Sequence, residues 1–229
     1  MPSRTRGQDT KQRILEEACR IFADKGYRNA THAEICRSAG TNVASINYYF
    51  GTKENLYREV FEQLKQQENR LYPLDGGLPE TAPAEDRLHA YILAQLRRMF
   101  DPENLGGLHK IRMAEMFDST GVLEKATKRQ LDEDRARIQK LLAELLGPEV
   151  PRIDLEWCEM SIISQCFVAV PAHKDKGPRK LFGLDRSVVE RLARHIFEFS
   201  LAGIEAIRLR NGARTPGRGK PKRNEEITL

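Results

Sequence analysis

Two short helices separated by one tight break are the feature of this chain that most constrains its fold. Thr31, followed three positions later by Glu34, has capping-box spacing and predicts a helix of about eight residues. Asn42 is suited to cap a second short helix over residues 43–49. The connection at residues 39–41 leaves room only for a tight turn, so the pattern predicts a helix-turn-helix.

A longer helix on each side completes this predicted unit. The first is expected from about Thr10 to Lys25 and to end at Gly26, because its apolar residues recur at helical spacing: Ile14, Ala18, Ile21 and Phe22. Another helix is expected after Thr52, with one apolar stripe formed by Leu56, Val60 and Leu64. Residues 8–68 are therefore predicted to form a DNA-binding domain.

The remaining sequence also has helical periodicity and no convincing strand pattern, so the predicted fold class is all-α. Residues 72–83 are rich in proline and glycine and are expected to form a linker or a long loop. Residues 84–210 are predicted to form a regulatory and dimerisation domain, and residues 211–229 a basic, disordered tail. Helices are expected over residues 88–100, 105–117, 121–146, 154–169 and 187–210, with a basic loop at 173–183. The apolar helix at 154–169 is expected to be buried on more than one face.

Composition agrees with an ordered globular protein: 40% of the 229 residues are hydrophobic and 31% are charged. The net charge of +5 is concentrated at the two ends, which suits a polyanionic partner without proving one. Four scattered cysteines form neither a disulfide framework nor a metal motif, and no secretory signal or long apolar segment is present. We therefore expect a cytoplasmic protein without a membrane partner, metal or cofactor.

The second short helix is the predicted reader of the DNA major groove. Ile46 and Phe50 are expected to face inward, whereas Val43, Ala44, Ser45, Asn47 and Tyr48 are expected to face the bases. Helix N-termini and phenolic or ammonium donors nearby are suited to phosphates. Arg4, Arg6 and Lys11 are candidates for an additional arm. The complete predicted DNA-contact set is Thr31, His32, Asn42, Val43, Ala44, Ser45, Asn47, Tyr48, Tyr49 and Lys53. Solvated or core positions remain the alternative for His32, Lys53 and the tyrosines.

The stretch RILEEACRIFADKGYRNATHAEICRSAGTNVASINYYFGTKENLYREVF resembles the N-terminal domain of TetR/AcrR-type regulators. The segments LHKIRMAEMF and SIISQCFV are similar to the C-terminal domain of the CecR subgroup. This resemblance implies an all-α homodimer with about nine helices per chain, joined through the last two helices, and a ligand cavity in the C-terminal domain. Asn47 departs from the aromatic residue that relatives often carry, so base preference does not transfer.

An unknown, partly apolar small-molecule effector is expected in that cavity, with Met113, Met116 and Phe117 as candidate contacts. The competing interpretation of each of these residues is ordinary core packing.

The predicted function is a ligand-responsive regulator that binds a palindromic double-stranded operator as a dimer. Repression is the expected mode of regulation. No nucleotide-binding, zinc-protease or serine-hydrolase motif occurs, so an enzyme is not expected and no catalytic residue is proposed. A helical adaptor without sequence-specific DNA binding is the alternative, and activator or nucleoid-associated roles remain open within the DNA-binding class. The basic tail adds nonspecific DNA affinity or is simply solvated.

Overall fold

The computed structural model describes residues 3–100, 107–168 and 186–212, and these residues form nine α-helices and no strand. The all-α prediction is confirmed. The predicted loop at 173–183 and residues 213–229 of the predicted tail lie outside the described ranges. The helices are α1 (Ser3–Asn29), α2 (His32–Ser38), α3 (Ala44–Phe50), α4 (Lys53–Leu71), α5 (Ala84–Phe100), α6 (Gly107–Phe117), α7 (Glu124–Leu146), α8 (Arg152–Val168) and α10 (Arg186–Gly212).

The helix ends near the N-terminus follow local capping chemistry. The Thr31 hydroxyl accepts the backbone N–H of Glu34 at 3.2 Å, and the Thr52 hydroxyl accepts that of Asn55 at 3.2 Å, as the sequence pattern predicts. Gly26 has a φ of 75° and kinks α1 at the predicted stop. The predicted start at Thr10 is wrong, because α1 already begins at Ser3. The apolar stripe indicates where this helix packs and not where it starts.

A first apolar core joins α1, α2, α3 and α4. Phe22, Ile35, Ile46 and Tyr57 are fully buried within it. The same core includes Leu108 and Ile111 of α6 and Leu123 just before α7, all buried. The helix-turn-helix unit is thus closed on one side by α6, whose residues lie well beyond the predicted domain end at residue 68.

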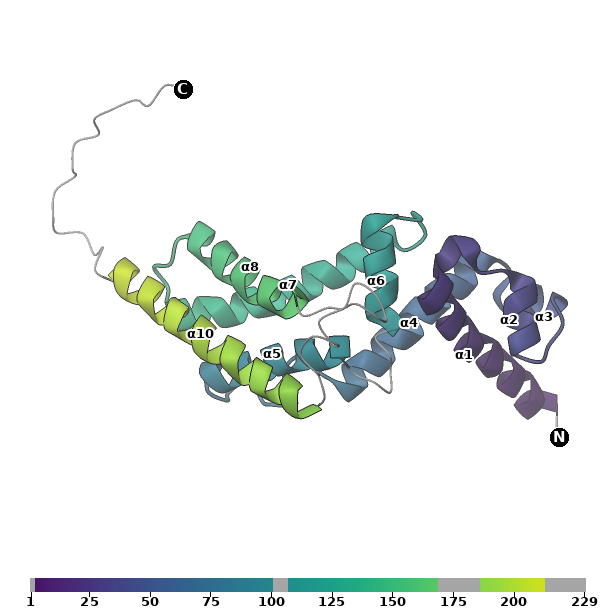
Figure 1. Cartoon of the computed structure of the whole chain (residues 1–229), viewed down its shortest axis with the longest axis horizontal. Coiled ribbons are helices and arrows are strands. Elements are labelled where there is room, and N and C mark those ends of the chain that lie inside the picture. Colours follow the sequence, from purple (N-terminus) through teal and green to yellow (C-terminus); the bar gives the residue numbers. More distant parts are fainter. Residues whose placement is uncertain (1–2, 101–106, 169–185, 213–229) are drawn as a thin grey trace, which may run out of the picture.

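A second apolar core lies between α5, α7, α8 and α10. In Figure 1, α1, α2 and α3 gather at one end of an elongated molecule, and α10 lies towards the other end, with α4 running between the two parts. Helix α4 runs between the two parts, and both α4 and α6 pack into the first core, so these two helices are placed to connect the two cores. The predicted boundaries at 68, 84 and 210 stay a prediction.

Helix α8 is buried on one face only, which corrects the prediction for this segment. Cys158, Ile162 and Cys166 are buried, whereas Trp157 is 55% exposed and Met160 is 61% exposed. Nothing in the described part of the single chain covers this second apolar face. None of the helices in the described ranges combines the length and apolar character needed to cross a membrane.

Candidate DNA-binding surface and internal cavity

Two buried side chains fix the orientation of α3. Ile46 and Phe50 are buried in the first core, as predicted, so the opposite side of the helix is open. Tyr48 is 82% exposed there, and Asn47 is exposed beside it. Val43 and Ala44 are also exposed, which agrees with their predicted outward position. The helix therefore presents a narrow, mixed surface that is suited to a DNA groove.

The turn before α3 is held by hydrogen bonds within a few residues. The backbone N–H of Thr41 donates to the carbonyl of Cys36 at 2.8 Å. Asn42 caps the helix as expected, since its Oδ1 accepts the backbone N–H of Ser45 at 3.0 Å. The Ser45 hydroxyl donates to the same oxygen at 3.1 Å, and Ser45 is half-buried and not fully exposed. Asn42 and Ser45 thus shape the start of α3.

The N-terminus of α2 carries the predicted pair Thr31 and His32. Thr31 is exposed, and its hydroxyl oxygen caps the helix. His32 is half-buried, and its Nε2 has no hydrogen-bond partner within the described residues. That nitrogen is itself buried, so DNA contact by His32 stays a prediction.

Lys53 and Tyr49 lie against aromatic neighbours. The Lys53 ammonium lies 4.5 Å from the centre of the Tyr27 ring, a cation–π contact. Burial lowers the pKa of Lys53, and nearby Glu54 opposes that shift. Tyr49 is half-buried against the first core, with its ring edge-on to Tyr48 at 4.8 Å. Both residues flank the exposed side of α3, and phosphate contact by either one stays a prediction.

Lys11 is engaged inside the chain. Its ammonium forms an ion pair with Glu59 at 2.9 Å and lies 5.2 Å from the centre of the Phe50 ring. Arg4 and Arg6 belong to the first turns of α1, and their side chains are outside the described part of the structure. The predicted arm is therefore a continuation of α1 in which Lys11 also braces α4.

A cavity of about 160 Å³ lies between α4, α5, α6, α7 and α8. Much of its wall is apolar and is formed by Tyr91, Met99, Met113, Leu131, Ile138, Ile163 and Phe167. Met113 thus lies in the wall of this cavity, and its contact with an effector stays a prediction. Met116 and Phe117 are not part of the wall, since they are 65% and 81% exposed at the end of α6. They follow Met113 by three and four positions and so share its side of α6, but they lie one turn further along, where the helix ends beyond the cavity.

A buried ion cluster joins three helices at the cavity wall. Glu68 at the end of α4 lies 3.4 Å from Arg98 of α5 and 3.1 Å from Arg112 of α6. Arg98 also donates to the carbonyl of Tyr72 and to Asn69 Oδ1, each at 2.9 Å. Burial lowers the pKa of Arg98, and Glu68 opposes the shift. The cluster ties α4 to both helices that carry its arginines.

Two polar side chains of the cavity wall remain incompletely bonded. His109 of α6 is 8% exposed, and burial together with Arg112 lowers its pKa to about 4, so the ring is neutral at pH 7. Gln130 of α7 is 4% exposed, and its Nε2 donates to Asp134 at 3.5 Å. Within the described residues neither His109 Nε2 nor Gln130 Oε1 has a hydrogen-bond partner.

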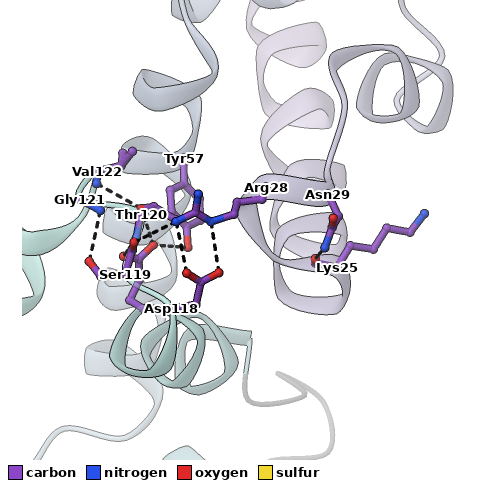
Figure 2. A network of polar contacts seen from close by, with 10 residues as sticks. Lys25, Arg28, Asn29, Tyr57, Asp118, Ser119, Thr120, Gly121 and Val122 are labelled. Atoms are coloured by element: carbon purple, nitrogen blue, oxygen red, sulfur yellow. Dashed lines mark hydrogen bonds and ion pairs between the residues drawn. The ribbon is translucent and has the colours of Figure 1, made fainter.

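The far end of α6 is bonded to the helix-turn-helix unit. Figure 2 shows Arg28 of α1 reaching Asp118, with contacts of 3.1 and 3.2 Å, and also the carbonyl of Ser119. A second set of contacts lies deeper in the protein. The Tyr57 hydroxyl donates to buried Glu115 at 3.0 Å, and the Thr120 hydroxyl donates to the same carboxylate at 2.7 Å. Burial, with Glu115, raises the pKa of Tyr57. One helix thus contacts both the cavity and the DNA-binding unit.

Comparison with known proteins places both halves of this arrangement in one group. Residues 14–60 match the family described as bacterial regulatory proteins, tetR family. Residues 84–204, more than half of the chain, match the C-terminal domain of the HTH-type transcriptional dual regulator CecR. The chain belongs to the tetR family. This tetR-family chain is therefore a DNA-binding transcriptional regulator and not an enzyme, which confirms the prediction from sequence.

Individual relatives support the same assignment, and the share of this chain that each one matches differs. CecR of Shigella flexneri is 44% identical over 52 residues, which is 23% of this chain and 23% of that relative. The regulator AcrR of Shigella flexneri is 24% identical over 171 residues, covering 71% of this chain and 76% of AcrR. The crystal structure of the TetR family regulator PfmR from Thermus thermophilus is similar in fold, with a TM-score of 0.60, 19% identity, and coverage of 82% and 97% of the two chains.

The polar part of the cavity in this tetR-family chain was not predicted from the sequence. Glu68 follows Leu56, Val60 and Leu64 at the next position of the same stripe, so a charge on an apolar face was the available signal. Arg98 gives the same signal, because it lies seven positions, or about two helical turns, after Tyr91 and so on the same side of the helix. Their partners come from other helices, which sequence spacing does not reveal.

Proposed function

We propose that this chain is a ligand-responsive repressor that binds a palindromic operator as a homodimer. The observation that carries the proposal is that α4 and α6 belong both to the cavity wall and to the core behind α3. A molecule in the cavity would lie against α6, which packs on α1 and α4, and beside Glu68 of α4, the helix that packs against α3. This arrangement gives ligand binding a physical route to DNA affinity.

Dimerisation is supported by exposed apolar side chains on the two last helices. Trp157 and Met160 of α8 and Phe199 and Leu209 of α10 are each more than half exposed. Trp157 and Phe199 line one shallow depression between these helices. A second copy that packs α8 and α10 against the same pair would bury this face in a two-fold interface.

The proposed mechanism is a shift in the spacing of two reader helices. In the dimer, two copies of α3 enter adjacent major grooves about one DNA turn apart. Ligand binding favours a state whose spacing no longer fits the operator. A coupling of about 1 to 3 kcal/mol would weaken operator binding by about 5- to 150-fold.

The first test is selection of bound sequences from random duplex DNA, with the winners compared against scrambled duplexes at about 150 mM salt. An inverted repeat bound at least about a thousandfold more tightly than scrambled DNA is the expected result. Weak, salt-sensitive binding without an enriched motif would contradict the operator proposal and favour the adaptor alternative. A promoter assay with the selected site then separates repression from activation, since CecR itself is named a dual regulator.

The dimer is tested separately by Phe199→Glu. A carboxylate in the apolar face of α10 is expected to convert the protein to monomers in light scattering and to weaken binding to the inverted repeat. The matched control is Glu198→Gln, a change at the neighbouring exposed position. A Phe199→Glu protein that remains dimeric would place the interface elsewhere.

A further inference from the structure

The charges that line the cavity already balance one another. The wall contains three carboxylates (Glu68, Asp134 and Glu159) and three guanidinium groups (Arg98, Arg112 and Arg135). Glu68 is shared by Arg98 and Arg112, and Arg135 pairs with Glu159 at 3.0 Å. Asp134 forms no ion pair within the described residues and accepts the Gln130 amide at 3.5 Å, so the wall is neutral only in sum. A charged ligand would therefore leave water without meeting a net opposite charge in the wall, which is costly in a partly enclosed site.

Within the described residues, two hydrogen-bonding atoms of the wall have no partner. The amide nitrogen of Gln130 is directed to Asp134, so its Oε1 is left as an acceptor that requires an N–H or O–H donor. His109 Nε2, on α6, is the other of these two atoms. As a neutral imidazole it offers one further hydrogen bond. Buried polar atoms without partners are rare in native proteins, and each one requires an explanation.

The cavity volume limits the size of the missing partner. About 160 Å³ is close to the roughly 150 Å³ of an engineered apolar cavity that holds one benzene molecule. The aromatic rings of Tyr91 and Phe167, together with Met113, provide apolar surface for a ring of that size.

We infer that the cavity binds an uncharged, single-ring molecule. This molecule donates one hydrogen bond to Gln130 Oε1 and forms a second hydrogen bond with His109 Nε2. A primary carboxamide on an aromatic ring has this chemistry, because its N–H donates and its carbonyl accepts. The inference rests on the proposed function only for the role of that molecule as an effector.

The test uses the full chain without DNA at pH 7, with four ring compounds of similar size. Benzamide carries both hydrogen-bonding groups, benzoate is an anion, benzylammonium is a cation, and toluene lacks hydrogen-bonding groups. Affinities are measured by ligand-observed NMR and calorimetry. Benzamide is expected to bind at least about tenfold more tightly than the other three compounds.

The matched variant is Gln130→Leu, which keeps the size of the side chain and removes its amide. It is expected to weaken benzamide binding by about tenfold or more and to leave toluene binding nearly unchanged. Gln63→Leu makes the same change at a half-buried position of α4 outside the cavity wall and is expected to alter neither affinity. His109→Phe provides a second variant if Gln130→Leu does not fold.

Three results would overturn the inference: tightest binding by benzoate or benzylammonium, unchanged benzamide affinity in folded Gln130→Leu, or binding of none of the four compounds. Because DNA is absent from this experiment, such a failure leaves the operator proposal intact. Failure of operator selection would equally leave a measured preference for benzamide in place.

Discussion

The helix-turn-helix unit and the cavity are built by opposite means. In the unit, helix starts are fixed by side chains three residues away, as at Thr31, Asn42 and Thr52, and the interior is apolar. In the cavity, the ion pairs join residues far apart in sequence, such as Glu68 and Arg112, and two buried atoms have no partner within the described residues.

This difference indicates a division of tasks. A short-range network presents α3 in one fixed orientation, which suits the reading of a rigid partner. Under the proposed function, the long-range polar network of the cavity is the part whose hydrogen bonds a bound molecule would change. Within the described residues, the helix-turn-helix unit also has two buried atoms without a partner, His32 Nε2 and Thr41 Oγ1, but these do not line a cavity.

The largest effect on stability is expected from Glu68→Ala. Removal of this carboxylate leaves Arg98 buried without its ion pair, which should lower the free energy of unfolding by about 3 to 5 kcal/mol. Denaturant unfolding at fixed protein concentration measures the loss. Glu62→Ala, at an exposed position of the same helix, serves as the control. A loss similar to that of the control would show that the cluster is not structurally important.

His109 provides a pH-dependent test of the cavity. Its pKa is about 4 in the folded chain, against 6.5 for the ordinary side chain, so the unfolded state binds the proton more readily. Stability from this group is complete above pH 6.5 and is lost as the pH falls towards 4, by about 3 kcal/mol. The drop in unfolding free energy between pH 7 and pH 4 should therefore be smaller in His109→Gln. Identical pH profiles would mean that the ring is already protonated or solvated in the folded protein.

The reader helix should show the reverse pattern, with a binding defect and no loss of stability. Asn47→Ala combined with Tyr48→Ala is expected to weaken binding to the selected operator by about a hundredfold. Both side chains are exposed, so the melting temperature should stay nearly constant. Fluorescence anisotropy measures the affinity. The double variant Lys128→Ala with Asp132→Ala changes two residues of α7 far from the reader helix in sequence and should bind normally; equal binding by both proteins would exclude the reader assignment.

The smallest effects are expected at the junction of the two regions. Tyr57→Phe removes the buried hydrogen bond to Glu115 and should lower the unfolding free energy by about 1 kcal/mol, since Thr120 still bonds that carboxylate. Arg28→Ala breaks a largely exposed ion pair and should cost less, within about 0 to 1 kcal/mol. Thermal unfolding of both variants in parallel ranks them, and a larger loss for Arg28→Ala would reverse the comparison.

Much of the N-terminal unit could be predicted from the sequence. The caps at Thr31 and Thr52, the break at Gly26 and the inward positions of Ile46 and Phe50 all depend on residues within a few positions of one another. Short-range interactions of this kind leave a spacing that can be recognised without coordinates. Helical periodicity in the rest of the chain extended the prediction to an all-α fold, and the family resemblance implied the same fold.

Other features depended on distant segments. The closure of the unit by α6, the exposed second face of α8 and the different surroundings of Met113 and Phe117 follow from the packing of helices far apart in the chain. The Glu68 cluster and the unpaired atoms of His109 and Gln130 belong to the same class. The amino-acid sequence determined which helices form and which face of each is apolar, because those properties are local. Only the tertiary structure decided which faces meet, because burial and electrostatic pairing depend on neighbours that the order of residues does not specify.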